Sequence, residues 1–349
     1  FRYDEELYRE LVAIREKIYS LKDLKKNKNS IDDIERKITL FHAKICKKII
    51  QEQSYEIDFV GFHGQTIFHN ADKKISRQLG DGNLLSNLLK KKVIYNFRKN
   101  DILNGGQGAP LTPIFHQLLV KKTKIKLPVG ILNIGGIANI TIISSKESET
   151  LKSYDIGPGN CLLDEWVRKH SKARYDKNGE LAKAGTTSKI LLNQAIDNFN
   201  NTNVSFDIKD FDLNFIRGLS LEDGLSTLTD FTAFIIHESI IKEFNFFKDD
   251  VLKILICGGG RKNLLLIDKI KEKLPKSIKL ILVDDYKIDG DFVESQAFAY
   301  LAIRSYLKLD ISFPKTTSCN SACTGGVLIK NFKKRVISFL IYLSIVFIN

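Results

Sequence analysis

The sequence predicts an α/β protein with two lobes. Its 349 residues are long for a single hydrophobic core, and 43% of them are hydrophobic, as in an ordinary soluble globular protein. Short apolar strands alternate with helical segments along the chain. Two of these strands, at 129–134 and 252–257, end in consecutive glycines. We therefore expect mixed sheets flanked by helices, and two glycine corners that form the walls of a ligand cleft.

The amino-terminal part is predicted to be helical to about residue 55, with a break near 27–30. The helices are charged and amphipathic. Ser30 is the expected N-cap of the second helix, because a serine hydroxyl can accept a hydrogen bond from the first turn. The strand that follows, at 58–62, delivers His63 at its carboxyl end.

The rest of the chain alternates between strand and helix. We expect further strands at 93–97, 129–134, 140–143, 252–257 and 278–283, and helices at 81–91, 112–120, 161–170, 187–199, 225–244, 263–273 and 292–306. A short strand ends at Asp155, and the polar run 200–212 is expected to be a loop. The first lobe is predicted to comprise 1–127, with 303–330 able to pack back on it. The second comprises 128–302, and 331–349 form a basic and apolar tail.

Charge and cysteine content exclude several classes of protein. The net charge is +13 and the isoelectric point about 9.3, but the lysines are spread along the chain. No arginine–aromatic cluster occurs, so we expect neither a nucleic-acid partner nor a membrane partner. The five cysteines are odd in number and form no CxxC pair, which supports neither a disulfide framework nor a zinc site. This usage fits a reducing cytoplasm, with Cys257 a buried small hydrophobe.

The two ends of the sequence are unusual. It starts at Phe1 and contains no methionine, so we expect that its true start is missing. At the other end, the apolar run Val336–Ile348 is shorter than the roughly 20 residues that a membrane-spanning helix needs. A packed terminal helix or a non-native extension is the expectation there, rather than an anchor.

Asp155 is the strongest catalytic candidate. A carboxylate at the end of a strand, before a Gly-Pro-Gly turn and a helix, lies where open α/β sheets bind ligands, and it can act as a general base. An aspartate that only forms the turn is an equally good interpretation of these residues alone. Gly135 and Gly136 at the first corner, and Gly258 at the second, lack a Cβ, so backbone N–H groups can approach a charged ligand there.

Five further polar residues are candidates, each with a plainer alternative. His63 and Gln65 on a strand-end turn could bind a polar ligand such as a sugar, or lie on a surface turn. Arg98 and Asp101 precede a glycine-rich loop and could instead form an exposed ion pair of little energetic consequence. Glu294 begins a helix, where it could simply stabilise the first turn. No GxxxxGK[ST] sequence occurs and no GxGxxG follows a strand, so we expect phosphate to be bound at the glycine corners together with a magnesium ion.

With these residues identified, the chain resembles the anhydro-N-acetylmuramic acid kinases, a family within the sugar kinase, Hsp70 and actin superfamily. The matching blocks follow the family's order over nearly the whole chain. They are GFHGQTIFH (61–69), FRKNDILNGGQGAPLTPIFH (97–116), ILNIGGIANIT (131–141), DIGPGNCLLDEW (155–166), YDKNGELAKAG (175–185), LEDGLSTLTDFTA (221–233), ILICGGGRKN (254–263) and ESQAFAYLA (294–302).

The resemblance implies two actin-like, ribonuclease H-like lobes around a nucleotide and sugar cleft. It implies a cytoplasmic, dimeric enzyme of peptidoglycan recycling, which uses ATP and Mg²⁺ to open the 1,6-anhydro ring of its amino sugar and phosphorylate O6. Asp155 is similar to the base that activates water, and the metal ligands stay unassigned. The sugar-binding positions that match are His63, Gln65, Thr66, Arg98, Asp101 and Glu294. The nucleotide-binding positions that match are Gly135, Gly136, Asn139, Gly157, Gly258, Gly259, Gly260 and Asn263.

Two departures from the family pattern leave alternatives open. The Gly-Thr-Ser-hydrophobic-Asp-Gly loop, the first phosphate motif of such kinases, is absent, and the Pro-Pro-Lys-Ser-Thr-Gly-Arg-like run is replaced at 203–210. A non-catalytic nucleotide- or sugar-binding protein is therefore one alternative to an active kinase. Another sugar kinase of the same superfamily is the second.

Overall fold

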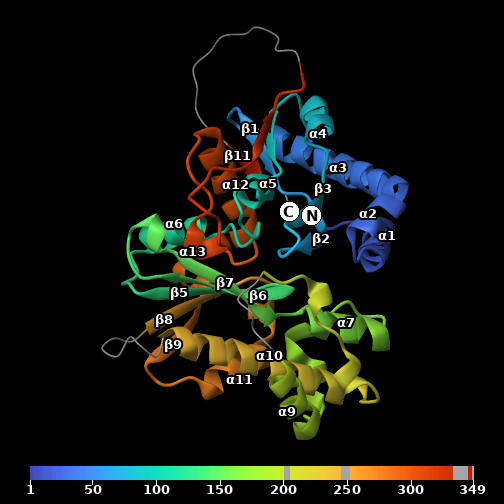
Figure 1. Cartoon of the computed structure of the whole chain (residues 1–349), viewed down its shortest axis with the longest axis vertical. Coiled ribbons are helices and arrows are strands. Elements are labelled where there is room, and N and C mark those ends of the chain that lie inside the picture. The colour runs from blue at the N-terminus through green and yellow to red at the C-terminus, as the bar shows by residue number, and fades with distance from the viewer. Residues whose placement is uncertain (200–204, 245–251, 333–344, 348–349) are drawn as a thin grey trace. The chain divides into compact units, whose positions relative to one another are not determined.

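The computed structural model describes residues 1–199, 205–244, 252–332 and 345–347 (Figure 1). Its contacts divide the chain into two compact units: unit 1 comprises Phe1–Phe115 with Glu294–Asn349, and unit 2 comprises His116–Val293. Each unit holds a β-sheet with helices packed against it, which confirms the predicted α/β class. The boundaries between the units lie at 115/116 and 293/294. The sequence predicts them later in the chain, at 127/128 and 302/303.

Unit 1 begins with helices α1 (Glu5–Lys17), α2 (Leu21–Lys26) and α3 (Lys28–Gln51). Asp4 caps α1 by accepting a hydrogen bond from the backbone N–H of Leu7 at 2.8 Å. The expectation that Ser30 is an N-cap is wrong, because α3 already begins at Lys28. Asn27 serves as both the C-cap of α2 and the N-cap of α3. The buried aliphatic faces of α1 and α3 share one hydrophobic cluster.

The sheet of unit 1 has the order β10-β4-β1-β11, with β1 (Phe59–Phe62) buried along its whole length. β4 (Lys92–Tyr95) and β11 (Ile345–Phe347) run parallel to β1, and β10 (Val327–Ile329) runs antiparallel to β4. The expected terminal helix is wrong for 345–347, which form a strand; the rest of the apolar tail lies outside the described residues. α12 (Val293–Tyr306) approaches β1 so closely that a Cβ at Gly61 would lie 3.1 Å from that of Ala302.

A hairpin in unit 1 escaped prediction from the sequence. It consists of β2 (Gln65–Asn70) and the antiparallel β3 (Ile75–Leu79). Its strands are mostly polar, and its turn contains no Asn-Gly or Asp-Gly pair, so the usual hairpin signals are missing. The remaining helices of the unit are α4 (Gly82–Leu89), α5 (Arg98–Leu103) and α13 (Pro314–Thr317), while α6 (Pro113–Thr123) extends across the boundary into unit 2.

The sheet of unit 2 has five strands in the order β7-β6-β5-β8-β9. β5, β8 and β9 are parallel, whereas β6 runs antiparallel to both β5 and β7. Since β5 and β8 are parallel neighbours, the glycines after both strands lie at one edge of one sheet. The two corners are therefore side by side on one sheet edge, and do not form two separate walls of a cleft as expected. The strand bounds are β5 Val129–Ile134, β6 Ile137–Ile143, β7 Lys152–Pro158, β8 Leu252–Cys257 and β9 Ile278–Leu282.

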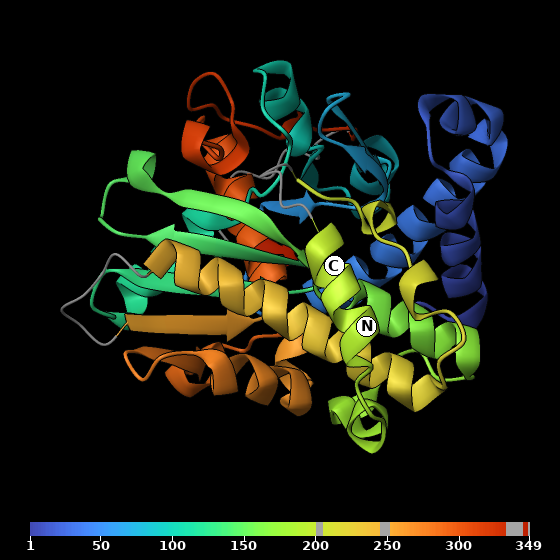
Figure 2. The ribbon, with the colours of Figure 1, turned by 60° about the horizontal axis from the view of Figure 1, so that its bottom comes forward.

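The long helix α10 (Leu221–Phe244) packs against β7 and against several helices of unit 2 (Figure 2). Cys257 is fully buried in this unit, as predicted. The other helices are α7 (Cys161–His170), α8 (Glu180–Ala184), α9 (Lys189–Asn198) and α11 (Leu264–Lys273). Short 3₁₀ turns are η1 (Ser148–Thr150), η2 (Lys177–Gly179), η3 (Ile208–Asp210), η4 (Asn214–Ile216), η5 (Gly259–Lys262) and η6 (Val283–Tyr286).

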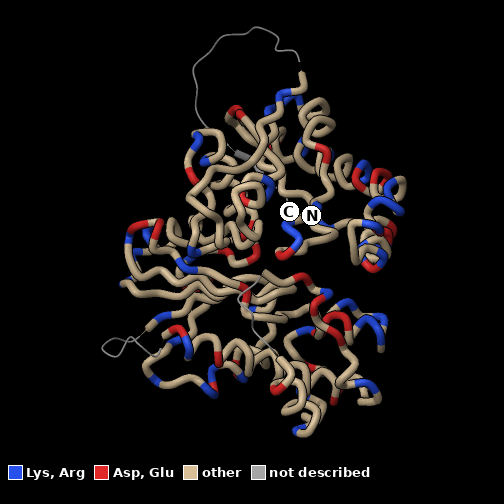
Figure 3. Tube along the Cα trace, viewed as in Figure 1, with Lys and Arg blue, Asp and Glu red and all other residues tan. Residues whose placement is uncertain are grey.

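The charged residues of both signs are interspersed along the trace (Figure 3). In the amino-terminal helices, for example, Lys37 lies 2.8 Å from Glu10 and 3.0 Å from Asp33. Within the part of the chain that the structure describes, no helix combines the length and the hydropathy needed to cross a bilayer.

Candidate active site

The first glycine corner of unit 2 joins β5 to β6 and is held against the start of α7. The carbonyl oxygen of Gly135 accepts a hydrogen bond from the N–H of Asn160 at 2.8 Å, and that of Gly136 accepts one from Gly159 at 2.9 Å. A Cβ on Gly159 would lie only 2.4 Å from the Gly135 oxygen. The corner and the amino end of α7 thus form one rigid backbone structure.

The glycines at this edge fall into two groups. Gly258 has a φ of 81°, and a Cβ on Gly260 would lie 2.2 Å from Ile134 Cγ2, so the fold itself requires both. Around Gly135 and Gly136 a Cβ would meet nothing closer than 3.4 Å, and around Gly259 nothing within 4 Å. None of these three glycines has a positive φ. The surrounding protein leaves room for a side chain at these three positions. This supports the view that glycine is present there because a ligand approaches the backbone closely.

Two other predicted nucleotide positions are explained by the fold. Gly157 has a φ of 156°, and a Cβ there would lie 2.9 Å from the Phe199 ring. Asn263 is 8% exposed and caps α11 through its side-chain oxygen, which accepts a hydrogen bond from Leu266 N at 3.1 Å. Both residues therefore shape the glycine edge from inside the protein.

A row of polar residues crosses three strands beside the first corner. Asn133 on β5 is opposite Asn139 on β6, and Asn139 is opposite Asp155 on β7. The Oδ1 atom of Asn139 is buried and has no hydrogen-bond partner among the described residues. A buried acceptor without a partner is costly, so it indicates that a ligand or water completes the site. Carboxylate and amide oxygens are the donors that Mg²⁺ takes, so Asn139 and Asp155 fit that ion.

Asp155 is 6% exposed. Its Oδ2 atom accepts two hydrogen bonds of 3.0 Å each, from the hydroxyl of Ser205 and from the backbone N–H of Phe206. The strand does not end at Asp155 as expected, because β7 continues to Pro158. Sequence reasoning missed Ser205: it lies in the segment that departs from the family pattern, and only the fold brings it to the carboxylate.

A second carboxyl group in unit 2 was also missed. Asp164 lies in the first turn of α7, and burial raises its pKa to about 6, against the lowering effect of Arg168. Among the described residues nothing hydrogen-bonds to its side chain. The available sequence signal was its place in the first turn after a glycine-rich bend, which by itself is common.

Arg261 fixes the second corner. It is 4% exposed and donates hydrogen bonds to Asp284 at 2.8 Å and to Asp291 at 2.7 Å. The hydrogen bond from Arg261 lowers the pKa of the Asp284 carboxyl. The corner is therefore tied to the segment that follows β9.

In unit 1, the structure brings His63, Arg98 and Glu294 together. Arg98 donates from Nη2 to His63 Nε2 at 3.2 Å, so Nδ1 of that ring carries the proton and donates to the Gly64 oxygen at 2.9 Å. The imidazole packs on Phe298, with ring centroids 4.0 Å apart. Burial, together with the nearby Arg98 charge, lowers the pKa of His63 to about 3. The ring is therefore a neutral acceptor and donor at physiological pH.

Glu294 lies one helical turn before Phe298 on α12, on the same face of that helix. Its side chain is exposed to solvent, yet the surrounding protein raises the pKa of the carboxyl, against the lowering effect of the Arg98 charge. Thr66 lies on β2, where its hydroxyl accepts a hydrogen bond from Gln78 at 3.2 Å. Gln65, also on β2, is half-buried.

Asp101 differs from these residues, because it is 1% exposed. One carboxylate oxygen accepts from the hydroxyl of Thr317 at 2.6 Å, and the other accepts from the N–H of Gly108 at 2.7 Å. Arg98 in turn donates to the Gly108 oxygen at 2.8 Å. Asp101 therefore orders the glycine-rich loop that supports Arg98.

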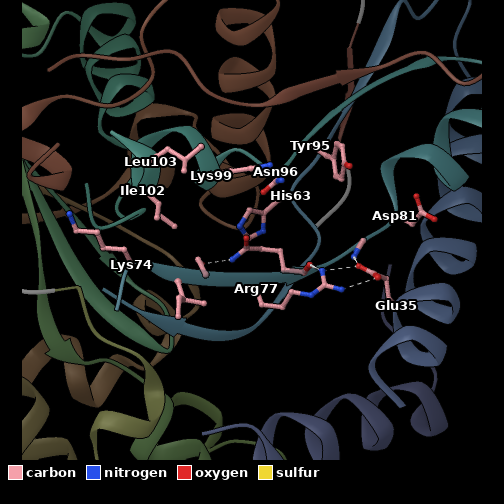
Figure 4. Close-up of a pocket in the computed structure, with 14 residues that line it drawn as sticks. Glu35, His63, Lys74, Arg77, Asp81, Tyr95, Asn96, Lys99, Ile102 and Leu103 are labelled. Carbon is pink, nitrogen blue, oxygen red and sulfur yellow. Dashed lines mark hydrogen bonds and ion pairs between the residues drawn. The ribbon is translucent and has the colours of Figure 1, made fainter. Parts of the chain in front are cut away.

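A groove of about 570 Å³ opens beside His63 (Figure 4). At one end, Arg77 pairs with Glu35 at 2.9 Å, which neutralises both charges. Lys74 and Lys99 also line the groove, and neither has an ion-pair partner among the described residues. The volume suits a small molecule, and the two lysines make the groove suitable for an anionic one.

Comparison with known proteins supports the family resemblance seen in the sequence. The sequence model of the family described as anhydro-N-acetylmuramic acid kinase matches residues 5–331. A relative of that name from Pelagibacter ubique (strain HTCC1062) is 62% identical over 336 residues, which cover 95% of this chain and 90% of the relative. A relative of the same name from Zymomonas mobilis subsp. mobilis is 36% identical over 298 residues, which cover 84% of this chain and 79% of the relative.

Among solved structures, the activator of the 2-hydroxyisocaproyl-CoA dehydratase from Clostridium difficile with bound ADPNP is similar at a TM-score of 0.34. Its sequence is 13% identical, and the match covers 55% of this chain and 67% of that one. A likeness this weak carries no argument. The family model matches nearly the whole sequence, and the relative from Pelagibacter ubique is 62% identical. This chain therefore belongs to the anhydro-N-acetylmuramic acid kinase family.

Proposed function

We propose that this protein opens the 1,6-anhydro ring of anhydro-N-acetylmuramic acid with water and phosphorylates O6 at the expense of ATP. Water adds at C1, the C1–O6 bond breaks, and O6 takes the γ-phosphoryl group. The products are N-acetylmuramic acid 6-phosphate, ADP and a proton. The observation that carries the proposal is Asp155, a buried carboxylate held in place beside an edge whose glycines leave room for phosphate.

In this proposal Asp155 is the general base that takes a proton from the attacking water. The hydrogen bonds from Ser205 and Phe206 occupy Oδ2 and fix the direction of the other oxygen, Oδ1. A fixed carboxylate needs less reorganisation to reach the attacking water than a mobile one. Ser205 is then a positioning residue, which acts through Asp155.

Nucleotide binding is proposed at the glycine edge of unit 2. Gly135, Gly136 and Gly259 would allow backbone N–H groups to approach the phosphates. Asn139 would offer its buried Oδ1 to Mg²⁺ or to one of its waters. When bound, Mg²⁺ neutralises part of the phosphate charge and so favours attack on the γ-phosphorus.

Sugar binding is proposed at His63, Gln65, Thr66, Arg98 and Glu294 of unit 1. The neutral His63 and the guanidinium of Arg98 provide hydrogen bonds of the kind that sugar hydroxyl and amide groups use. N-acetylmuramic acid carries a carboxylate on its lactyl ether, and Lys74 and Lys99 in the adjoining groove have the complementary charge. We further propose a cytoplasmic homodimer that serves peptidoglycan recycling.

The proposal is tested by incubating the full-length gene product with ATP, Mg²⁺ and anhydro-N-acetylmuramic acid, and identifying the sugar product by mass and by phosphorus–proton NMR correlation. We expect one ADP per sugar and a phosphate ester at the C6 oxygen. Sugars without a 1,6-anhydro bridge are the comparison substrates. Transfer to one of these instead would identify another sugar kinase, and binding of ATP without any transfer would identify a non-catalytic binding protein.

A further inference from the structure

Three donor atoms of unit 1 meet at a place that has no part in the proposed reaction. They belong to Asp101, Cys319 and Cys323, and they all lie within 4.8 Å of one another. Asp101 and Cys319 are 1% and 3% exposed, and Cys323 is half-buried. Such a meeting of two sulfur atoms and one carboxylate oxygen is not visible in the sequence, because Asp101 is more than two hundred residues away and the cysteines have no CxxC spacing.

The backbone holds this cluster firmly. Thr317 donates its hydroxyl to Asp101 at 2.6 Å, and Gln107 donates its N–H to the Thr317 oxygen at 2.8 Å. Asn320, between the cysteines, donates its N–H to the Asn104 oxygen at 2.9 Å. Cys323 pairs with Ser312 in an antiparallel bridge. The donors are therefore fixed by two segments, 98–108 and 312–323, that are clamped together.

The donor set is specific in its chemistry. Thiolates are soft ligands that select zinc and similar ions, whereas Mg²⁺ takes oxygen donors only. Tetrahedral zinc with bonds of about 2.0–2.3 Å separates its ligands by about 3.5–3.8 Å, so side-chain shifts of about 1 Å would close the cluster. Each oxygen of Asp101 accepts one hydrogen bond within the protein and retains a second lone pair.

Thiolate is the form of cysteine that binds such a cation, so binding at this cluster would release the protons of the two thiols.

We propose that Asp101, Cys319 and Cys323 form a binding site for a thiophilic divalent cation of the zinc class, with the fourth position open to water. The bound cation cross-links the segment after α13 to α5, whose Asp101 accepts a hydrogen bond from Gly108 of the glycine-rich loop. Because Gly108 of that loop is hydrogen-bonded to Arg98, the cation stabilises the loop that supports the Arg98 side chain. It does not take part in the phosphoryl transfer.

The test uses the full-length protein, reduced with a phosphine and titrated with Cd²⁺, whose thiolate complexes absorb in the ultraviolet. We expect saturable absorbance at a single cation per chain, displacement of Cd²⁺ by Zn²⁺, and no displacement by excess Mg²⁺. The same cation should slow hydrogen–deuterium exchange in peptides that cover 104–108. Replacing both cysteines by alanine should abolish the absorbance, while Cys46→Ala, which removes a buried thiol of α3, should leave it unchanged.

Circular dichroism of each variant shows whether it is folded, and Asp101→Asn provides a second comparison if the double cysteine variant is not. We expect Asp101→Asn to weaken Cd²⁺ binding by about 10-fold or more, with the thiolate band retained at saturation. Absorbance that survives in the folded double variant would overturn the proposal. So would a reduced wild-type protein that takes up no Cd²⁺, or one whose Cd²⁺ uptake does not saturate.

Discussion

Asp164→Asn should make the protein more stable at neutral pH, although it removes a charged residue. The carboxyl group lies in the first turn of α7, and burial raises its pKa from 3.8 to about 6. A carboxyl whose folded-state pKa is raised favours the native state while it is protonated, and that contribution is lost as the pH rises through 3.8 to 6. Asparagine has no such ionisation, so the variant avoids the loss.

The size of the effect follows from the pKa shift. At about 1.36 kcal/mol per pKa unit, a shift from 3.8 to about 6 corresponds to about 3 kcal/mol between strongly acidic and neutral pH. The helix terminus favours the charged form by only about 0.3–1 kcal/mol, so burial dominates. Over the practical range from about pH 5 to about pH 8, a folded-state pKa of about 6 lowers the free energy of unfolding of the wild type by about 1.4 kcal/mol.

The assay is urea unfolding of wild type and variant at several pH values between about 5 and 8. The quantity of interest is the variant's free energy of unfolding minus that of the wild type, which should rise by about 1.4 kcal/mol across this range and level off above pH 7. Asp197→Asn, at an exposed position of α9, is the matched control for the loss of an aspartate charge. A flat difference for Asp164→Asn, or one that falls with pH, would refute the burial argument.

The other predictions concern residues of both units. Gly260→Ala should lower the free energy of unfolding by about 1–3 kcal/mol, because its Cβ would overlap Ile134. Gly259→Ala should leave the free energy of unfolding unchanged and weaken ATP binding, as measured by calorimetry. If Gly259→Ala destabilised the protein more than Gly260→Ala, the division of the glycines into structural and ligand-facing groups would be wrong. The ring protons of His63 should show no titration by NMR between about pH 5 and pH 8, since its pKa is lowered to about 3; a midpoint within that range would show that the ring is not neutral as described. Ser205→Ala should lower kcat by about 10-fold with little change in KM for the sugar, as expected of a group that positions the base; an increase in KM alone would place Ser205 in sugar binding instead.

Much of the fold can be predicted from the sequence where periodicity and burial agree. The strand at 252–257 is a continuous apolar run, and it forms β8, buried between two parallel neighbours. The helices at 161–170 and 263–273 are amphipathic, and α7 and α11 occupy nearly those residues. The hairpin β2–β3 could not be found in this way, because its residues are mainly polar and its turn lacks a glycine signal.

The candidate site was predictable as a set of residue types but not as an arrangement. Consecutive glycines and Asp155 can be recognised in the sequence, yet that the two corners share one sheet edge depends on β5 pairing with β8. The contact of Ser205 with Asp155 joins residues far apart in the sequence, and it lies in the very segment that departs from the family pattern. Asp101 was recognised as a candidate for sugar binding, but only its burial identifies its role in ordering the loop.

Asp155 is the proposed base of the reaction, and the kcat of Asp155→Asn tests that role. Asparagine keeps an oxygen that can accept the hydrogen bonds from Ser205 and Phe206, but it cannot take a proton from water. We predict that kcat falls by about 10²–10⁴-fold, while calorimetry shows ATP and sugar binding close to that of the wild type. A kcat within a few-fold of that of the Asp197→Asn control would show that Asp155 is not the base and assign that role to another residue.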